Sequence, residues 1–325
     1  MGQLVGGVWQ EDKDRTVGGH FQRPATVFRN WITPDGGAGP SGTDGFPAQA
    51  GRYHLYVSHA CPWAHRTTIF RKLKKLDDVI SLSVVSPFMG KEGWVFGAPG
   101  TADTVNGATR LSEVYLAADA TYTGRVSVPV LWDKERRTIV NNESSEIIRM
   151  LNSAFAAHTD DRADYYPEEL RREIDEINAL VYPNINNGVY RTGFASTQAA
   201  YEEAFRALFD TLAAIEERLA GQRYLVGNRL TEADWRLFTT LIRFDAVYVG
   251  HFKCNWKRIA DYSNLSNYLR DLYQVPGVAE TVHLDHIKQH YYASHRHINP
   301  TGIVPVGPEL DFNAPHDRDR FAADT

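Results

Sequence analysis

Between residues 51 and 155, short hydrophobic runs alternate with longer segments of mixed character. The short runs are rich in β-branched and aromatic residues, which favour strands, whereas the mixed segments are typical of helices. Such an alternation indicates a compact α/β domain. We therefore predict strands over 52–58, over 79–85 and through "VSVPVLW" and "TIVNN", with helices from Pro62 to about Lys75, near 110–119 and through "SSEIIRML".

The pattern changes after about residue 165, where strand signals stop. Apolar residues in "EELRREIDEINALVY" and again between 201 and 220 recur at helical spacing. Thr231 with Asp234 three residues on forms an Asp variant of the capping box, which predicts the start of a buried helix. A further helix in "YSNLSNYLRDLYQVPGV" is stopped by its Pro-Gly pair. We predict an all-helical domain over 165–298.

The two ends of the chain are rich in Gly and Pro and show neither the strand pattern nor the helical spacing of apolar residues. We predict an irregular N-terminal extension over 1–50 and an extended C-terminal tail over 299–325. The α/β domain and the helical domain therefore lie between two segments without regular structure.

Composition narrows the class of protein. The chain has 325 residues, 43% hydrophobic and 23% charged, with a net charge of −5, which fits a globular protein of about two domains. No concentrated basic segment predicts nucleic-acid binding, and no apolar run approaches the roughly 20 residues of a membrane span. The N-terminus lacks the order of a signal peptide, and two cysteines make no disulfide framework. We expect a cytoplasmic protein.

Cys61 lies between a predicted strand and a predicted helix, and Pro62 follows it. Proline is favoured in the first helical turn, so Cys61 is expected at a helix N-terminus. The N–H groups and the dipole there favour a thiolate, which makes Cys61 a candidate nucleophile. A buried structural thiol is the alternative.

Pro129 interrupts the strand pattern "VSVPVL". It marks an edge strand, a strand start or a cis peptide bond. A cysteine at a strand–helix junction followed by a strand proline resembles the thioredoxin-like fold. In that fold a cis proline lies beside the thiol and exposes a backbone edge to a peptide-like ligand.

The motif around Cys61 is CPWA, without a resolving cysteine one turn away. Cys254 is far along the chain and is expected to pack inside the helical domain. A mixed disulfide on Cys61 would therefore need an external thiol to release it. In the cytosol that thiol is glutathione, so the sequence favours a monothiol, glutathione-dependent cycle.

Glu143 and Ser144 precede the helix "SSEIIRML". A helix start binds carboxylates, and the Glu143 carboxylate pairs with ammonium groups, so the two suit the γ-glutamyl end of glutathione. Simple helix capping by Ser144 or Ser145 is the alternative. With Cys61 and Pro129 upstream, we favour ligand binding.

A histidine-rich segment near the C-terminus raises the question of a metal site. His286 and His290 are spaced i, i+4, which suits zinc on one helical face. No Cys or acidic ligand set accompanies them, so we predict no metal. The segment's histidines are His283, His286, His290, His295 and His297.

The segments "SHACPWAHR", "GVYRTGFA" and "HIKQHYYASHRHINPTGIVPVGP" together resemble the glutathionyl-hydroquinone reductases, the Xi class of the glutathione transferases. The resemblance covers nearly the whole chain. It implies the glutathione transferase fold: an α/β thioredoxin-like N-terminal domain over 51–155 followed by an all-α C-terminal domain. It also implies a homodimer and no metal.

The resemblance further implies roles for particular residues. Cys61 would be the nucleophile, and Tyr190 the acid that serves the aromatic substrate. Tyr248 and Tyr291 would complete the polar wall, with Tyr292 as the alternative to Tyr291. The residues implied to bind glutathione are Trp94, Arg125, Val128, Pro129, Glu143 and Ser144.

The implied reaction is the reduction of glutathionyl-hydroquinones through a mixed disulfide of Cys61 with glutathione, with glutathione as co-substrate. One rival is an omega-like thiol transferase or dehydroascorbate reductase, which would share Cys61 but not need the tyrosines. Another is a non-catalytic binding module of the same fold, which retention of Cys61 argues against.

Overall fold

The computed structural model describes residues 2–11, 16–98 and 100–321. The chain forms two compact units. Unit 1 comprises Met1–Lys13, Pro24–Ala163 and Asp285–His290, and unit 2 comprises Asp14–Arg23, Asp164–Leu284 and Tyr291–Thr325. Residues 1, 12–15, 99 and 322–325 lie outside the described residues, and so do the predictions made for them.

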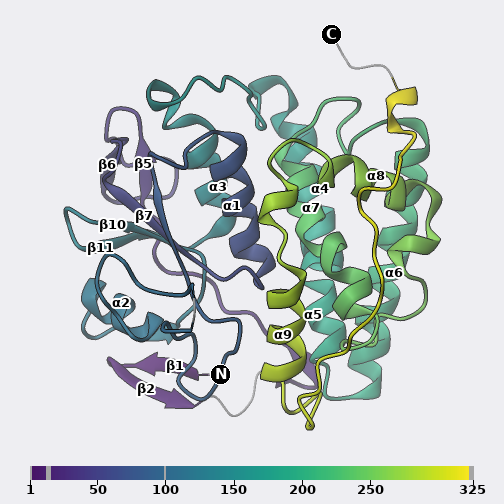
Figure 1. The fold of residues 1–325 in the computed structure, drawn as a ribbon, viewed down its shortest axis with the longest axis horizontal. Helices are drawn as coiled ribbons and strands as arrows, with labels where there is room; N and C mark the ends of the chain where they lie inside the picture. Colours follow the sequence, from purple (N-terminus) through teal and green to yellow (C-terminus); the bar gives the residue numbers. More distant parts are fainter. Residues whose placement is uncertain (1, 12–15, 99, 322–325) are drawn as a thin grey trace. The chain divides into compact units, whose positions relative to one another are not determined.

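Unit 1 is built on a mixed four-stranded sheet in the order β11-β10-β7-β8. The strand β7 (Tyr53–Val57) is fully buried, runs parallel to β8 (Ser81–Val84) and antiparallel to β10 (Val130–Asp133), which pairs with β11 (Thr138–Asn141). Helices α1 (Pro62–Leu73) and α3 (Ser144–Ser153) pack against each other beside this sheet, and α2 (Leu111–Ala118) contacts β11 (Figure 1). The predicted α/β order is confirmed.

The prediction of an irregular segment over 1–50 is wrong for much of its length. Strands β1 (Gly2–Val5) and β2 (Val8–Glu11) form a hairpin that β9 (Gly124–Arg125) extends, and β5 (Trp31–Thr33) pairs with β6 (Gly45–Pro47). Gly6 and Gly7, both with positive φ, make the hairpin turn. Strands of two to four residues are too short to show a period in the sequence.

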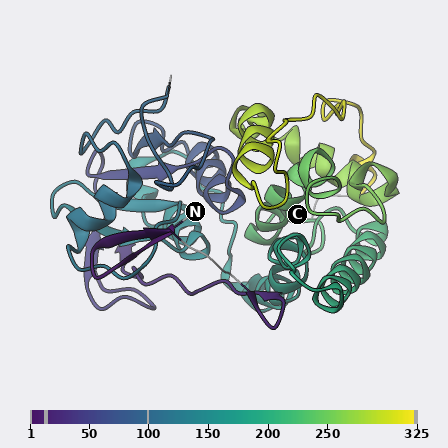
Figure 2. The same ribbon diagram turned by 90° about the horizontal axis from the view of Figure 1, so that it is seen from below.

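Among its described residues, the regular structure of unit 2 is helical apart from one short hairpin. The hairpin strands β3 (Thr16–Val17) and β4 (His20–Phe21) lie beside the teal helices in Figure 2, and β4 contacts α5. The α-helices are α4 (Arg171–Val181), α5 (Gly188–Gly193), α6 (Gln198–Gly221), α7 (Glu232–Arg243) and α8 (Ser263–Tyr273). Helix α9 (Leu284–Ser294) is divided between the units, with Asp285–His290 in unit 1 and its two ends in unit 2. Two π-helices, η3 (Tyr182–Asn186) and η4 (Phe244–Tyr248), precede α5 and follow α7.

Short 3₁₀ segments complete the regular structure: η1 (Ala156–His158), η2 (Glu168–Leu170), η5 (Ile259–Asp261), η6 (Ala279–Thr281) and η7 (Arg318–Arg320). Among the helices of the described residues, none combines the length and the apolar character needed to cross a membrane.

The predicted domain limits differ from the two units in that residues 14–23 belong to unit 2 and 285–290 to unit 1.

The capping box at the start of α7 is present as predicted. The buried Asp234 carboxylate accepts hydrogen bonds from the Thr231 N–H at 2.8 Å, the Leu225 N–H at 2.8 Å and the Tyr268 hydroxyl at 2.8 Å. Burial raises the pKa of Asp234 to about 6. One carboxylate thus joins α7, α8 and the preceding loop inside unit 2.

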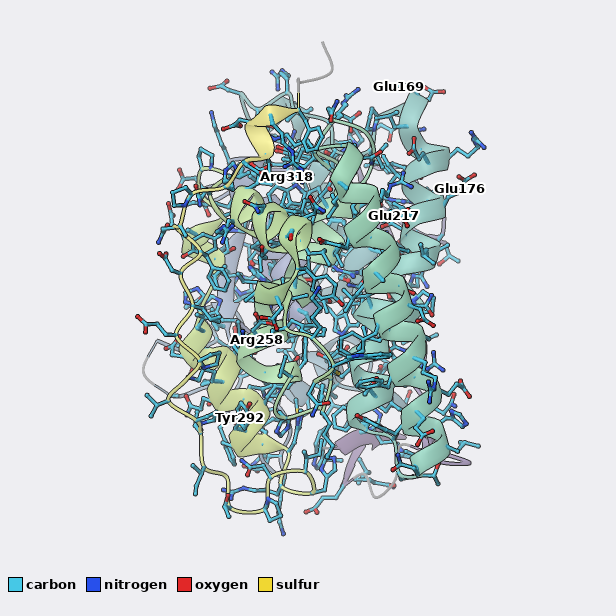
Figure 3. The ribbon with its side chains drawn as sticks, turned by 90° about the vertical axis from the view of Figure 1, so that its right-hand side faces the viewer. Glu169, Glu176, Glu217, Arg258, Tyr292 and Arg318 are labelled. Atoms are coloured by element: carbon cyan, nitrogen blue, oxygen red, sulfur yellow. The ribbon has the colours of Figure 1, made fainter. Side chains whose placement is uncertain are left out.

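The C-terminal tail is extended, as predicted, and ends in η7. Arg318, marked in Figure 3, is buried there and donates to the carbonyl oxygens of Leu219 at 2.9 Å and Arg223 at 2.8 Å. These carbonyls lie at and just after the C-terminus of α6, where cations are favoured. The tail is therefore fixed to unit 2 by a side chain that caps a helix.

Candidate functional site

Cys61 is the N-cap residue of α1, directly after the loop that leaves β7. Its backbone has extended geometry, and its carbonyl accepts the first helical bond, from the His65 N–H at 2.9 Å. The Cys61 side chain is partly exposed. The predicted helix N-terminus is confirmed, and a thiolate here faces the positive end of the helix dipole.

The Val128–Pro129 peptide bond is cis, and Pro129 directly precedes β10. Of the three interpretations of this proline, the strand start and the cis bond both hold. The Cys61 Sγ lies 3.6 Å from the Val128 carbonyl oxygen. The structure therefore brings Cys61, Val128 and Pro129 together, as the sequence predicted.

The start of α3 differs in detail from the sequence prediction. The N-cap is Glu143, whose carboxylate accepts from the Ser145 N–H at 3.1 Å, so capping by Ser144 or Ser145 is wrong. Ser144 is the first helical residue and is buried, with its Oγ 3.4 Å from Nη1 of Arg66. Arg66 is itself buried and lies over the Trp63 ring, 4.6 Å from its centroid. A buried cation beside a helix N-terminus suits a carboxylate ligand.

Trp94 is buried and stacks on His290 of α9, with ring centroids 4.8 Å apart and planes inclined by 21°. His290 is also buried, and its Nδ1 lies 2.9 Å from the Pro87 carbonyl oxygen, the geometry of an Nδ1–H donor. The His290 ring thereby fixes the face of the indole that it covers. Sequence reasoning weighed His290 only as a zinc ligand and missed this role.

Arg125 lies on β9, where it pairs with Gln3 of β1. Its carbonyl oxygen accepts a hydrogen bond from the Tyr122 hydroxyl at 3.0 Å. The N-terminal strand that the sequence did not reveal thus supports a residue predicted to bind glutathione.

Three tyrosine hydroxyls meet inside unit 2. The Tyr291 hydroxyl lies 2.5 Å from that of Tyr190 and 3.1 Å from that of Tyr248. Burial raises the pKa of both Tyr248 and Tyr291 well above the ordinary value. Tyr190 is 9% exposed, against 0% for Tyr248 and 1% for Tyr291, so it is the member of this tyrosine cluster that meets solvent most.

Of Tyr291 and Tyr292, it is Tyr291 whose hydroxyl joins the tyrosine cluster. Tyr292, marked on α9 in Figure 3, directs its hydroxyl to the Ala246 carbonyl oxygen at 3.4 Å. Neighbouring positions on an α-helix point about a quarter turn apart, so only one of the two reaches the cluster.

The π-helices set where two of these tyrosines lie. Tyr248 is the last residue of η4, and Tyr190 lies in α5 shortly after η3. A π-helix inserts a residue into the helical register and so rotates the side chains that follow; such insertions are frequent at functional sites. Nothing in the hydrophobic pattern marks these insertions.

Three other histidines of the C-terminal segment also have aromatic partners. His286 contacts the His59 ring at 5.4 Å, and His295 lies 3.1 Å from His251, nitrogen to nitrogen. His297 stacks on Phe194. Within residues 2–11, 16–98 and 100–321, no three His, Cys, Asp or Glu side chains are grouped to hold a metal ion. That the protein uses no metal stays a prediction.

Cys254 is fully buried, as expected, and burial raises the pKa of its thiol. It forms no disulfide with Cys61, both being described residues. A thiol that is buried and hard to ionise is chemically inert. Among the described residues the chemistry of sulfur therefore rests on Cys61.

Comparison with known proteins agrees with this geometry. The family model for the N-terminal domain of glutathione S-transferase matches residues 60–154, and that for the C-terminal domain matches residues 198–271. The chain is 57% identical over 324 residues to the glutathionyl-hydroquinone reductase YqjG of Escherichia coli K12, covering 98% of this chain and 99% of that protein.

Solved structures give the same result. The glutathione-bound structure of YqjG has a TM-score of 0.92 at 55% identity and covers 98% of this chain and 100% of its own. A Xi-class glutathione transferase from Natrialba magadii has a TM-score of 0.92 at 50% identity, covering 100% and 98%. With both family domains matched and relatives this similar over their full length, the chain belongs to the glutathione transferase family, in the Xi class of the glutathionyl-hydroquinone reductases.

Proposed function

We propose that this protein reduces glutathionyl-hydroquinones to hydroquinones with glutathione as co-substrate. The observation that carries the proposal is the position of Cys61, partly exposed at the N-cap of α1, with its Sγ 3.6 Å from the carbonyl oxygen of the cis Val128–Pro129 bond. The similarity to a glutathionyl-hydroquinone reductase over nearly the whole chain supports the same activity.

Glutathione binding is proposed to use the starts of regular elements in unit 1. The N-terminus of α3, with Ser144 and the neighbouring Arg66, suits the γ-glutamyl carboxylate, and the Glu143 carboxylate suits the ammonium. The backbone of Val128 suits the middle of the tripeptide, Trp94 offers an aromatic face, and Arg125 a cation for the glycyl end. Glutathione-bound YqjG, a relative of the same fold, supports this proposal.

In the first half-reaction, the Cys61 thiolate attacks the sulfur that joins glutathione to the aromatic ring. The carbon–sulfur bond breaks, a Cys61–glutathione disulfide forms, and the electron pair stays with the ring carbon. That carbon takes a proton, which we assign to the Tyr190 hydroxyl, and the hydroquinone leaves. General-acid assistance of this kind contributes about 10²–10⁴-fold to the rate.

In the second half-reaction, a glutathione thiol loses its proton and its thiolate attacks the mixed disulfide. Glutathione disulfide leaves, the Cys61 thiolate is restored, and the released proton returns to the Tyr190 oxygen. Both half-reactions then balance, and the cycle is ping-pong with a covalent intermediate. Because Cys254 is buried and its pKa is raised, an external thiol has to complete the cycle.

Mass spectrometry tests the proposal directly. Incubation with a glutathionyl-hydroquinone but no free glutathione is expected to add one glutathionyl group to Cys61 and to release one equivalent of hydroquinone. Faster turnover of dehydroascorbate than of the glutathionyl-hydroquinone would favour an omega-like reductase. No adduct with either substrate would favour a binding module.

Two further expectations belong to the same proposal. A homodimer is expected from the family, and sedimentation at micromolar concentration tests it. A cytoplasmic location supplies the reduced glutathione that the second half-reaction consumes, and fractionation of cells that express the protein tests it.

A further inference from the structure

Arg23 follows the β3–β4 hairpin and lies over the ring of Tyr190 in unit 2. Its guanidinium carbon is 4.8 Å from the centroid of the Tyr190 ring and 5.4 Å from that of Phe21. Its Nε donates a hydrogen bond to Oδ1 of Asn187 at 2.8 Å. Arg23 lies in the N-terminal segment that the sequence predicts to be irregular, and no sequence motif marks it.

Asn187 connects Arg23 to the helix that carries Tyr190. Asn187 is the N-cap of α5, and its carbonyl oxygen accepts from the Tyr190 N–H at 3.1 Å. Arg23 is therefore held at two points on α5, by the amide that begins the helix and by the aromatic face one turn later. A cation fixed over the ring of a tyrosine is attracted more strongly once the ring bears the negative charge of a phenolate.

The groups around the tyrosine cluster favour ionisation at Tyr190 over its two partners. Tyr248 and Tyr291 are sealed from solvent, and a negative charge on Tyr190 raises the pKa of both further. The buried Arg243 acts in the opposite direction on these two tyrosines.

Rings also surround the tyrosine cluster. His251 and His295 face Tyr291, at ring distances of 6.3 and 5.5 Å. Phe21, Phe194 and Phe252 cover the Tyr190 ring. Arg23 adds a cation in direct contact with the Tyr190 ring, which these aromatic neighbours do not supply.

We infer that Arg23 is a positioning residue that makes Tyr190 the proton donor of the tyrosine cluster, by stabilising the phenolate left after proton transfer. This inference rests on the proposed function for its role in the reaction. The Tyr190 and Tyr291 hydroxyls lie 2.5 Å apart, and once Tyr190 is a phenolate only the Tyr291 hydroxyl has a proton to donate, so it stabilises the same charge at the oxygen.

A titration of protein labelled with ¹³C at the tyrosine ring carbon that bears the hydroxyl tests the inference without using activity. The Tyr190 resonance is identified by its loss in Tyr190→Phe. Replacing Arg23→Met is expected to move its titration midpoint upward by about half a pH unit, a roughly three-fold change in proton affinity. Arg23→Lys is expected to restore part of that change. Arg206→Met, which removes an exposed cation from α6, is the charge-matched control and is expected to leave the midpoint unchanged.

The outcomes separate the inference from the proposed function. An equal midpoint in Arg23→Met and Arg206→Met would overturn the inference, as would a Tyr190 resonance that stays neutral up to the pH at which the fold is lost. If the midpoint moves as expected and the alkaline limb of the pH dependence of kcat moves with it, the inference is supported in full. If the midpoint moves but the wild-type protein does not turn over glutathionyl-hydroquinones, the proposed function fails while the electrostatic role of Arg23 stands.

Discussion

In unit 1 the proposed nucleophile and several residues proposed to hold glutathione lie where regular elements begin, whereas in unit 2 the proposed proton donor lies inside a packed aromatic cluster. Cys61 and Glu143 are the N-caps of α1 and α3, and Pro129 directly precedes β10. Tyr190, Tyr248 and Tyr291 instead join hydroxyl to hydroxyl.

The difference fits what each unit would have to recognise under the proposed function. Element ends leave backbone N–H and C=O groups without partners, and these groups suit a tripeptide rich in carboxylates and amides. A buried cluster offers no such groups, but it fixes the position of a hydroxyl and controls its proton. Unit 1 is thus suited to binding and nucleophilic attack, and unit 2 to proton transfer.

The largest expected effect concerns Cys61. Cys61→Ala is expected to abolish turnover of a glutathionyl-hydroquinone, and Cys61→Ser to leave little, because an alcohol at this position is far harder to ionise than a thiol. Cys254→Ala is the matched control, since that thiol is fully buried and lies outside the proposed site. Turnover that survives in Cys61→Ala, measured as hydroquinone release, would move the chemistry out of unit 1.

Asp234 tests the scaffold of unit 2 separately from its chemistry. Asp234→Ala leaves the Thr231 N–H, the Leu225 N–H and the Tyr268 hydroxyl without their shared acceptor, so we expect a loss of about 3 kcal/mol in the free energy of unfolding. Urea denaturation measures it, with the exposed Asp210→Ala as control. A loss below about 1 kcal/mol would mean that the carboxylate is not the centre of this network.

Acid is expected to lower the free energy of unfolding of unit 1 through protonation of His54 in β7. Burial lowers the pKa of His54 to about 4, below the ordinary value of 6.5, so the unfolded chain binds the proton first. The stability contributed by the neutral ring is complete above pH 6.5 and is lost as pH falls toward 4, in total about 3 kcal/mol. Unfolding free energies of wild type and His54→Asn between pH 7 and 4 measure the effect.

In unit 2 the stability contributed by Asp234 has the opposite dependence on pH. The pKa of Asp234 is raised to about 6, so its contribution is present at low pH and is lost as pH rises through about 6. His54→Asn is therefore expected to flatten the acid loss, and Asp234→Asn to steepen it. Equal slopes in wild type and His54→Asn would show that the His54 ring does not control the acid response.

Tyr190→Phe is expected to lower kcat by about 10²-fold or more and to leave the affinity for glutathione nearly unchanged, because the lost hydroxyl serves the leaving ring carbon. Tyr292→Phe, one residue after Tyr291 but outside the cluster, is the control and is expected to behave as wild type. Steady-state kinetics and a separate binding measurement distinguish the two effects. A parallel loss of kcat and glutathione affinity would mean a structural role for Tyr190.

The smallest expected effect is at His290. His290→Leu removes the ring stacked on Trp94 and the bond to Pro87, so we expect glutathione affinity to fall about three- to ten-fold with little change in kcat. Gln289→Leu, exposed on the same helix, is the control. Quenching of tryptophan fluorescence by glutathione measures the affinity of both variants. Unchanged affinity in His290→Leu would show that Trp94 needs no support from α9.

The sequence predicted unit 1 better than unit 2 because its signals are local. A cysteine before Pro62, a proline in a strand pattern and an acidic residue before a helix each mark an element boundary within a few residues. The hairpin of β1 and β2 was missed since strands of four residues show no usable period, although the Gly-Gly pair between them is a turn signal.

The tyrosine cluster has no local signature. Its members come from α5, η4 and α9, and π-helical insertions displace two of them from the regular register. Family resemblance suggested the tyrosines, but spacing alone does not bring them together. Arg23 was missed for the same reason, because its partner Tyr190 is far along the chain and only the tertiary structure joins them.

The sealed position of Cys254 has a practical consequence. Because the Cys254 side chain is 0% exposed and Cys61 is partly exposed, one equivalent of a maleimide should label the folded protein once, at Cys61, and abolish its activity. Dye incorporated per chain would then count competent molecules in any preparation, without engineering the sequence.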